Sequence, residues 1–350
     1  MSKTMKAMVI HAPMQYEVTD VPVPEPASGE LRLKVEAVGL CGSDLRTIRS
    51  GHKHVQFPWT LGHEICGTVE ALGDDFEGPW NVGDRLSVGP NTYDPADPYC
   101  VEGRHELSEE IREIGQAWKG GFAEKMIIPR ESVLMGNLLP APAQLDSIYA
   151  AIVEPGSSVI HAHEKANTHM GDTVLIMGAG PIGCLHVAVA RASGAEKVFL
   201  ADLVEKRLEL AAAFEPDALI NMKEKDLAQE VRQLTGGAGP DVVITANPAP
   251  SSQVTAVELA AKGGRVVLFG GLPHDDSKPG VDMNLVHYKN LTLVGISKFA
   301  PRHFRRSLQM LASGRIPGEK LVTHVLPLSE FDKGVRLAMN GEALKVVYKP

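Results

Sequence analysis

Short stretches of alternating apolar and polar residues, separated by glycine and proline, fill the first part of the chain. Leu31–Val38 alternates along its length, which is the period of a β-strand with one buried face. Gly67–Gly73 and Arg85–Val88 repeat the pattern, and Gly83 and Asp84 supply a turn between them. These strands predict a β-rich, partly closed barrel.

From about residue 155 the pattern changes to continuous apolar runs that alternate with helical segments. This alternation is typical of βαβ units around a parallel sheet. The predicted strands are Asp172–Met177, Lys197–Asp202, Ala218–Ile220, Asp241–Thr245, Arg265–Phe269 and Leu291–Gly295. The predicted helices begin at Cys184 and Glu205 and lie near Asp226–Leu234, Gln253–Ala261 and Arg302–Ser313. A last strand, Lys345–Lys349, is expected to return to the first domain.

Length and composition limit the class of protein. At 350 residues, with 44% apolar and 22% charged residues, the chain fits a globular protein of two domains. Its net charge of −8 argues against a nucleic-acid or anionic-membrane surface. No apolar run reaches the roughly 18 residues of a membrane span. The first residues lack the apolar core of a signal peptide. We expect reduced cysteines and a cytoplasmic protein.

A glycine motif follows the first buried strand of the second domain. Gly178, Gly180 and Gly183 have the G-x-G-x-x-G spacing, in which the glycines permit a tight turn, close approach to a pyrophosphate and helix packing. Asp202 ends the next strand, where its carboxylate would accept hydrogen bonds from the hydroxyls of a ribose diol and would repel a 2′-phosphate. NAD is therefore favoured over NADP. Arg207 could serve a ribose edge or a phosphate. The predicted cofactor-binding set is Gly178, Gly180, Pro181, Ile182, Gly183, Asp202, Arg207, Leu272 and Ser297.

Candidate metal ligands lie in the first domain. Cys41 offers a thiolate, His63 an imidazole and Glu64 a carboxylate, which are ligand types that Zn²⁺ prefers. Singly, each residue has a structural explanation as a core thiol, a capped histidine or a solvated acid. Together they suggest a catalytic zinc, and zinc beside a nicotinamide predicts hydride transfer to or from an alcohol carbon.

Five motifs occur in an order that resembles the zinc-dependent medium-chain dehydrogenase/reductase superfamily. They are Val38–Asp44, Leu61–Gly67, Gly83–Arg85, Gly120–Glu124 and Gly178–Gly183. Val153–Pro155 with His161-Ala162, and the tail from His287 to His324, resemble the sorbitol (L-iditol 2-) dehydrogenase branch in particular. The resemblance implies an α/β protein with a GroES-like β-rich catalytic domain (1–155), a Rossmann doubly wound parallel-sheet NAD-binding domain (156–295) and a C-terminal return to the catalytic domain (296–350).

The resemblance also implies roles for individual residues. Cys41, His63 and Glu154 are expected at or next to the catalytic zinc, and Glu64 is expected to be a ligand that exchanges with water. Ser43 matches the hydroxyl that relays the substrate proton. Two carboxylates and a thiolate would overcompensate the charge of one zinc, so we expect Glu64 and Glu154 to bind alternately, or one of them through water. Dimers or tetramers are implied as well.

The chain departs from the branch in two places. Where members often carry four cysteines around a structural zinc, it has Asp94, Asp97, Cys100 and Ser108, so one zinc per subunit is expected. Where polyol dehydrogenases carry an aromatic residue and an Arg-Tyr pair in the substrate region, this chain has Arg46-Thr47 and Lys298-Phe299. Arg46 and Lys298 belong either to solvated faces or to a pocket for a phosphorylated or acidic sugar derivative.

The predicted activity is NAD-linked oxidation of a secondary hydroxyl of a polyol or sugar derivative to a ketone. An L-threonine 3-dehydrogenase shares the zinc motifs and stays an alternative. A metal-free NADPH quinone reductase would lack the set Cys41, His63 and Glu64. A non-catalytic nucleotide-binding protein of the same fold is the alternative from another class.

Overall fold

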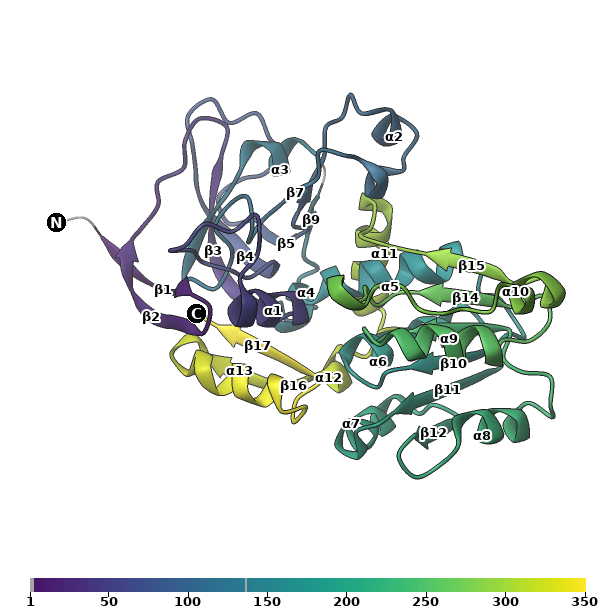
Figure 1. Cartoon of the computed structure of the whole chain (residues 1–350). Coiled ribbons are helices and arrows are strands. Elements are labelled where there is room, and N and C mark those ends of the chain that lie inside the picture. The colour runs from purple at the N-terminus through teal and green to yellow at the C-terminus, as the bar shows by residue number, and fades with distance from the viewer. Residues whose placement is uncertain (1–2, 136) are drawn as a thin grey trace. The chain divides into compact units, whose positions relative to one another are not determined.

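The computed structural model describes residues 3–135 and 137–350. The chain divides into two compact units (Figure 1). Unit 1 takes the residues up to Ser157 together with Phe299–Gly314 and Val322–Pro350, and unit 2 takes Ser158–Lys298 and Arg315–Leu321. Unit 1 is therefore assembled from three separate segments of the chain.

A seven-stranded sheet forms the centre of unit 1. Its strands in spatial order are β16 (Val322–Pro327), β17 (Lys345–Lys349), β3 (Leu31–Gly39), β4 (Glu64–Leu72), β5 (Arg85–Val88) and β9 (Leu138–Pro140), with β8 (Lys125–Ile128) also paired to β3. The alternation of β3 buries Leu31, Leu33 and Val35 on one face, as its sequence predicts. The final strand β17 pairs with β3.

The other elements of unit 1 cover this sheet or extend from it. They are the hairpin β1 (Thr4–Ala12) and β2 (Gln15–Pro22), the pair β6 (Asn91–Thr92) and β7 (Arg112–Glu113), helices α1 (Gly42–Ser50), α2 (Pro98–Val101), α3 (Arg130–Leu134), α4 (Ser147–Ala151), α11 (Pro301–Ala312) and α13 (Phe331–Met339), and turns η1 (His105–Leu107) and η4 (Leu328–Glu330). The rings of Phe331 and Tyr348 stack at 4.9 Å in the core, and Phe122 meets both edge-on.

Unit 2 is a doubly wound α/β unit. Its six parallel strands are ordered β12 (Ala218–Asn221), β11 (Lys197–Asp202), β10 (Thr173–Met177), β13 (Val242–Thr245), β14 (Arg265–Leu268) and β15 (Thr292–Gly295). In chain order this is 3-2-1-4-5-6, the Rossmann arrangement that places a ligand crevice at the carboxyl ends of the strands. All six strands were predicted from their apolar runs. The helices and turns are α6 (Pro181–Ala192), α7 (Glu205–Ala211), η2 (Ala212–Phe214), α8 (Leu227–Leu234), α9 (Pro250–Leu259), η3 (His274–Asp276), α10 (Met283–Lys289) and α12 (Gly318–Leu321), and α5 (Val153–Lys165) crosses the boundary between the units.

Two of the buried histidines of unit 2 contact each other. His163 Nε2 on α5 lies 3.1 Å from His186 Nδ1 on α6, and His163 Nδ1 lies 2.9 Å from the Thr168 hydroxyl. His186 Nε2 is buried without a hydrogen-bond partner. Burial, which disfavours the charged imidazolium, lowers the pKa of His163 to about 4 and holds that of His186 well below its usual value. Both imidazoles are therefore neutral at pH 7.

The lobe that carries Asp94, Asp97, Cys100 and Ser108 is organised around Asp97. One carboxylate oxygen of Asp97 accepts the amide of Tyr99 at 2.8 Å, and the other accepts the hydroxyl of Ser108 at 3.1 Å. Arg302 of α11 donates to the carbonyl of Gly103 and so ties the lobe to the rest of unit 1. Hydrogen bonds to one carboxylate thus connect the two ends of the lobe.

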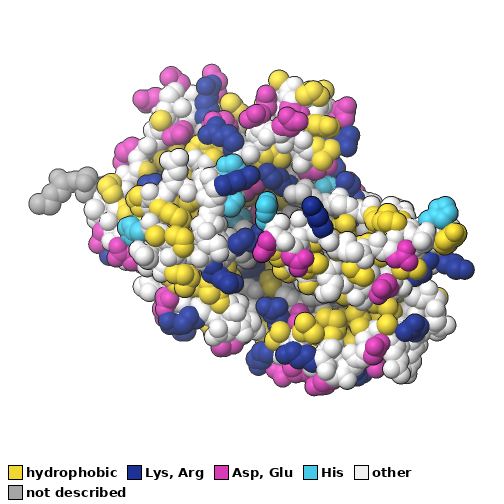
Figure 2. All heavy atoms as spheres, viewed as in Figure 1, with side chains coloured by type: hydrophobic (Ala, Val, Ile, Leu, Met, Phe, Trp, Pro, Cys, Tyr) yellow, Lys and Arg dark blue, Asp and Glu magenta, His cyan; other side chains and the backbone are white. Residues whose placement is uncertain are grey.

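Charged side chains of both signs are interspersed on the face of the molecule that Figure 2 shows. Within residues 3–135 and 137–350, no helix is both long and apolar enough to cross a membrane. The four cysteines, Cys41, Cys66, Cys100 and Cys184, are free thiols, as expected from the sequence.

Candidate functional site

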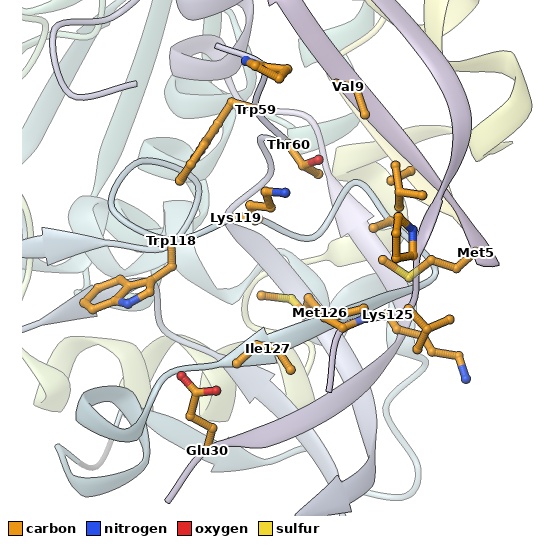
Figure 3. A pocket seen from close by; sticks show the side chains of 18 residues that line it. Met5, Val9, Glu30, Trp59, Thr60, Trp118, Lys119, Lys125, Met126 and Ile127 are labelled. Carbon is orange, nitrogen blue, oxygen red and sulfur yellow. The ribbon is translucent and has the colours of Figure 1, made fainter. Parts of the chain in front are cut away.

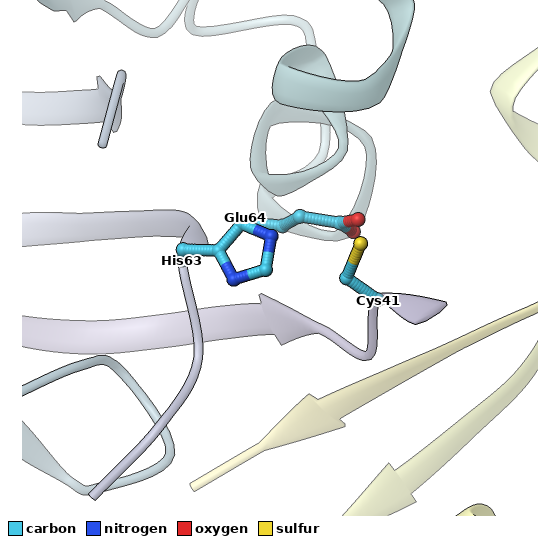
Figure 4. A group of neighbouring side chains, drawn as sticks. All are labelled: Cys41, His63 and Glu64. Atoms are coloured by element: carbon cyan, nitrogen blue, oxygen red, sulfur yellow. The ribbon is translucent and has the colours of Figure 1, made fainter. Parts of the chain in front are cut away.

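Three of the predicted metal ligands converge in unit 1. Cys41 is the N-cap of α1, and His63 and Glu64 stand at the start of β4, which pairs with β3. One ligand atom from each residue (the thiol sulfur, a ring nitrogen and a carboxylate oxygen) lies within 4.8 Å of the other two. Figure 4 shows the Cys41 sulfur and the Glu64 carboxylate pointing toward each other beside the His63 ring. This donor set suits Zn²⁺.

Asp44 orients two members of this group and was missed by the sequence analysis. It is 4% exposed and lies at the third position of α1. Its Oδ2 accepts the amide of Cys41 at 3.0 Å, and its Oδ1 lies 3.3 Å from His63 Nδ1. A carboxylate on Nδ1 fixes the ring so that Nε2 faces a metal. The charges of Asp44 and Cys41 raise the pKa of His63 well above its usual value, although burial opposes them.

Glu64 is fully buried, and its two carboxylate oxygens have different surroundings. Its Oε1 accepts a hydrogen bond from Lys345 Nζ at 2.7 Å, while its Oε2 is buried without a partner. Glu64 also pairs with Gly39 across the two strands, where a Cβ on Gly39 would lie 2.0 Å from Oε2. Only glycine therefore leaves room for this carboxylate. The unpartnered oxygen beside a thiol and an imidazole is what a cation would satisfy, so the residues fit a metal ion.

Glu154 and Ser43 stand next to the convergent group. Glu154, at the start of α5, does not belong to the set within 4.8 Å among the described residues. Its pKa is raised to about 7, first by burial and then by the charge of Glu64, against the opposing charges of His63 and Lys345. The Ser43 hydroxyl is 3.4 Å from His63 Nε2, on the exposed start of α1.

The predicted cofactor residues line two hollows of unit 2. Gly178, Asp202 and Arg207 line one of about 440 Å³, and Leu272, Ser297 and Lys298 line another of about 410 Å³. Pro181 and Ile182 open α6, the helix that follows the glycine turn. A Cβ on Gly183 would lie 1.8 Å from the carbonyl of Gly178, so the third glycine of the motif is required by helix packing. Gly180 is the N-cap of the same helix.

Asp202 is 6% exposed at the end of β11. Its two oxygens accept the amides of Ala179 and Val204 at 2.7 and 2.8 Å, which holds the carboxylate against the glycine turn. Each oxygen keeps a second lone pair for a ligand hydroxyl. This fixed negative charge is the feature from which the sequence analysis favoured NAD.

The predicted substrate residues belong to different units. Arg46 is exposed on α1 in unit 1, and Lys298 closes the long segment of unit 2. Lys298 has a φ of 60°, which is uncommon for a residue with a side chain, and its carbonyl accepts a hydrogen bond from His161 Nδ1 at 2.9 Å. Tertiary contacts therefore fix the backbone at this position.

A separate hollow of about 620 Å³ lies in unit 1 (Figure 3). The side chains of Trp59, Trp118 and Met126 line it, together with Lys119. None of the candidate metal ligands contributes to it. The chemistry-bearing residues and this larger apolar hollow are thus distinct features of unit 1.

Comparison with known proteins agrees with this geometry. Residues 27–140 match the model of the alcohol dehydrogenase GroES-like domain, and residues 181–313 match that of the zinc-binding dehydrogenase. A sorbitol dehydrogenase of Halalkalibacterium halodurans is 32% identical over 99% of both chains. An L-threonine 3-dehydrogenase of Bacillus subtilis is 30% identical over 95% of this chain and 94% of its own.

Solved structures of the same fold extend over the whole chain. Galactitol-1-phosphate dehydrogenase from Escherichia coli has a TM-score of 0.89 at 27% identity and covers 99% of this chain and all of its own. Two further structures cover both chains completely: one from Sinorhizobium meliloti 1021, bound to NADP, at 29% identity and a TM-score of 0.91, and one from Escherichia coli CFT073, with NADH, at 28% and 0.88. The chain belongs to the zinc-dependent medium-chain dehydrogenase/reductase superfamily and is an oxidoreductase of its sorbitol dehydrogenase-like branch.

Proposed function

We propose that this protein is a zinc-dependent, NAD-linked dehydrogenase that oxidises a secondary hydroxyl of a polyol or sugar derivative to a ketone. The observation that carries the proposal is the convergence of Cys41, His63 and Glu64 within 4.8 Å in unit 1 of a chain whose other unit has a nucleotide fold. A donor set of this kind with a nicotinamide cofactor serves hydride transfer at an alcohol carbon.

Cys41, His63 and Glu154 would hold the zinc, with Glu64 as an exchangeable ligand. Bound Zn²⁺ is a Lewis acid that lowers the pKa of bound water from about 15.7 to about 7, and an alcohol responds in the same direction. Glu154 is proposed as a zinc ligand because it is partly buried and next to the group of Cys41, His63 and Glu64, although it lies outside the set of atoms within 4.8 Å. We propose one zinc per subunit, because Asp97 and Ser108 hydrogen-bond to each other where the branch often has thiolates.

The chain's own residues would handle the substrate proton. Ser43 places its hydroxyl 3.4 Å from His63 Nε2 on an exposed helix start, where it can pass a proton from a substrate hydroxyl toward solvent. Asp44 keeps the His63 ring oriented throughout, since it contacts Nδ1 rather than the face toward Ser43. Ser43 is thus the proton carrier and Asp44 a positioning residue.

NAD is the proposed cofactor because of Asp202. Its carboxylate lines the same hollow as Gly178 and is held in place by two backbone amides, so a 2′-phosphate brought there would meet a fixed negative charge. Arg207 lines the same hollow and could pair with a ribose edge or a phosphate. The related structures include one with NADP and one with NADH, so this preference is a property to measure on this chain.

The proposed substrate is a small polyol or sugar derivative, phosphorylated or acidic where Arg46 and Lys298 take part. The sorbitol dehydrogenase relative supports the polyol, and the similarity to galactitol-1-phosphate dehydrogenase supports a phosphate. Arg46 is exposed on unit 1, and Lys298 lines a hollow of unit 2 with Ser297, and a cation of either kind pairs well with a phosphate or carboxylate. A homodimer or homotetramer is proposed for the assembly.

L-threonine is the second candidate substrate, because the relative from Bacillus subtilis that oxidises it is 30% identical along nearly the full chain. Both candidates require an intact metal group. A non-catalytic nucleotide-binding protein would not need the unpartnered oxygen of Glu64 beside a thiol and an imidazole.

A substrate panel tests the proposal. Reduced-cofactor absorbance is followed with neutral polyols, polyol phosphates, aldonic acids and L-threonine, each with NAD and with NADP. We expect turnover of polyols or their anionic derivatives, at a kcat/KM at least tenfold higher with NAD. Lys298→Ala should raise KM for anionic substrates only, while Lys262→Ala, an exposed control in unit 2, should leave it unchanged.

The outcomes separate the candidates. Turnover of L-threonine alone would select the second candidate, and equal effects of Lys298→Ala on charged and neutral substrates would remove the anion pocket. If a zinc-loaded sample turned over none of the panel members, the proposed reaction would be contradicted.

A further inference from the structure

The hollow of unit 2 that Ser297 and Lys298 line is bounded by backbone in an uncommon conformation. It lies past the carboxyl ends of β14 and β15, and Lys298 has a φ of 60°. Glu215 and Asn290 also have a positive φ, but they are the left-handed residues that end η2 and α10. Lys298 instead follows a strand and lines a hollow. Strain of this kind persists only where surrounding contacts impose it, and it is concentrated at ligand sites.

A buried histidine holds the carbonyl group of Lys298. His161 is 2% exposed, and its Nδ1 lies 2.9 Å from the carbonyl oxygen of Lys298. A carbonyl oxygen only accepts, so Nδ1 carries the proton and donates the hydrogen bond. Helix α5 supplies this donor: Ser158 lines the hollow, and His161 follows one turn later on the same side of the helix. The helix that contributes to the wall thus also fixes the backbone of Lys298.

The strand order indicates which part of a dinucleotide this hollow receives. A Rossmann sheet binds one mononucleotide on each half, on either side of the point where the strand order reverses. Here that point lies between β10 and β13. The hollow lined by Gly178 and Asp202 lies at the ends of β10 and β11, where Asp202 would meet the adenosine ribose. The hollow lined by Ser297 lies at the ends of β14 and β15, on the half that receives the nicotinamide.

We propose that His161 is a positioning residue for the nicotinamide end of the cofactor. Its hydrogen bond holds Lys298 at a positive φ, and this keeps Ser297 and Lys298 in the wall of the hollow. Without the donor, Lys298 returns to the negative φ that residues with a Cβ favour, and the wall moves. The adenosine half of the cofactor binds at the other hollow and does not depend on His161. The inference rests on the proposed function for the identity of the cofactor.

The test compares two ligands on the full chain by titration calorimetry. NADH spans both hollows, whereas ADP-ribose lacks the nicotinamide and needs only the hollow of Asp202. His161→Leu removes the donor, so the Kd of NADH should rise at least tenfold while that of ADP-ribose stays within threefold. His161→Asn carries an amide donor near the place of Nδ1, and its Kd for NADH should stay within threefold of the native value.

Two further variants separate this role from a general loss of structure. His163→Leu removes another buried imidazole of α5, one that contacts Thr168 and His186, and should leave both Kd values within threefold. In His161→Leu/Lys298→Gly the glycine adopts a positive φ without strain, so the Kd of NADH should lie within threefold of that of Lys298→Gly alone. Equal weakening of NADH and ADP-ribose in His161→Leu would overturn the proposal, as would a native NADH affinity.

Lys298→Pro keeps the proposal testable if His161→Leu fails to fold. The proline ring holds φ at about −65°, so the backbone cannot take its native conformation, and NADH should bind at least tenfold more weakly while ADP-ribose is unaffected. An unchanged NADH affinity would show that the conformation of Lys298 does not matter, and the proposal would be wrong. The expected affinities together with an inactive substrate panel would reject the proposed reaction and leave the role of His161 standing. A native chain that does not bind NADH would overturn both.

Discussion

At the scale of single residues, the candidate metal group depends on a carboxylate that binds no metal itself. Asp44 contacts the amide of Cys41 and Nδ1 of His63, so one side chain sets the position of a thiol and of an imidazole. Because it is 4% exposed, solvent does not replace these contacts when they are lost. Such partners of a ligating histidine affect metal affinity strongly.

Replacing Asp44 by Asn keeps the size of the side chain and removes its charge. We expect zinc affinity to fall about 10–100-fold, because the His63 ring loses the carboxylate that orients it. Competition with a chromophoric chelator measures the change. Asp20→Asn, an exposed carboxylate of the β1–β2 hairpin, is the matched control and should match the native affinity. An Asp44→Asn affinity within twofold of native would contradict the orienting role.

At the scale of elements, α5 and α6 pack through an unusual polar contact. The imidazoles of His163 and His186 replace the apolar pair expected between two buried helix faces. His186 also meets the ring of Phe269 edge-on at 4.7 Å. Their pKa values lie below the value in an unfolded chain, so folding favours the neutral form of both rings.

This packing predicts a loss of stability in acid. The stabilisation that the two neutral imidazoles contribute is fully present above the pKa of about 6.5 that a histidine has in the unfolded chain. It is lost as the pH falls toward 4, because the unfolded chain then binds protons that the buried rings do not bind. Between pH 7.5 and 4.5 the native protein should lose more of its unfolding free energy than His186→Phe, because the pKa of the buried His186 lies well below its usual value. Urea denaturation at both pH values measures it, and equal losses in the two proteins would count against the buried pair.

At the scale of the whole molecule, the two units divide the chemistry. The candidate metal ligands all belong to the first segment of unit 1, whereas the hollows lined by Asp202 and Ser297 belong to unit 2. The lobe that could have carried a second metal is organised by the Asp97 carboxylate. We therefore propose that the metal content of the protein is set by the group of Cys41, His63 and Glu64 alone.

Metal analysis of the purified protein should give one zinc per chain. Cys41→Ser should abolish zinc retention, because a hydroxyl is a poor Zn²⁺ ligand. Cys100→Ser, in the lobe, is the matched control and should retain one zinc. Two zinc ions per native chain, or loss of zinc from the Cys100 variant, would show that the lobe binds metal.

The sequence pattern predicted those elements whose residue types are required by their own local structure. The apolar runs of β10 to β15 and the motif at Gly178 were recognised because a strand covered on both faces and a tight turn each require particular residues in sequence. The hairpin of β1 and β2, the helix α13 and strand β16 were missed although their contacts are with neighbours in the chain: β1 pairs with β2, and α13 packs against β16 and β17. Asp44 and Lys345 were missed for another reason: each is an ordinary charged residue until the fold brings it to His63 or Glu64.

The strand order of unit 1 has a consequence for biosynthesis. On the ribosome, all six strands of unit 2 emerge before β17, so that sheet can close while unit 1 still lacks this strand. Until β17 emerges, Glu64 has no ammonium group to pair with, and the neighbouring strand β3 presents an unpaired edge at Gly39. The nascent chain must therefore carry its candidate ligands in an incomplete sheet, and the mature site forms only after β17 has joined that sheet.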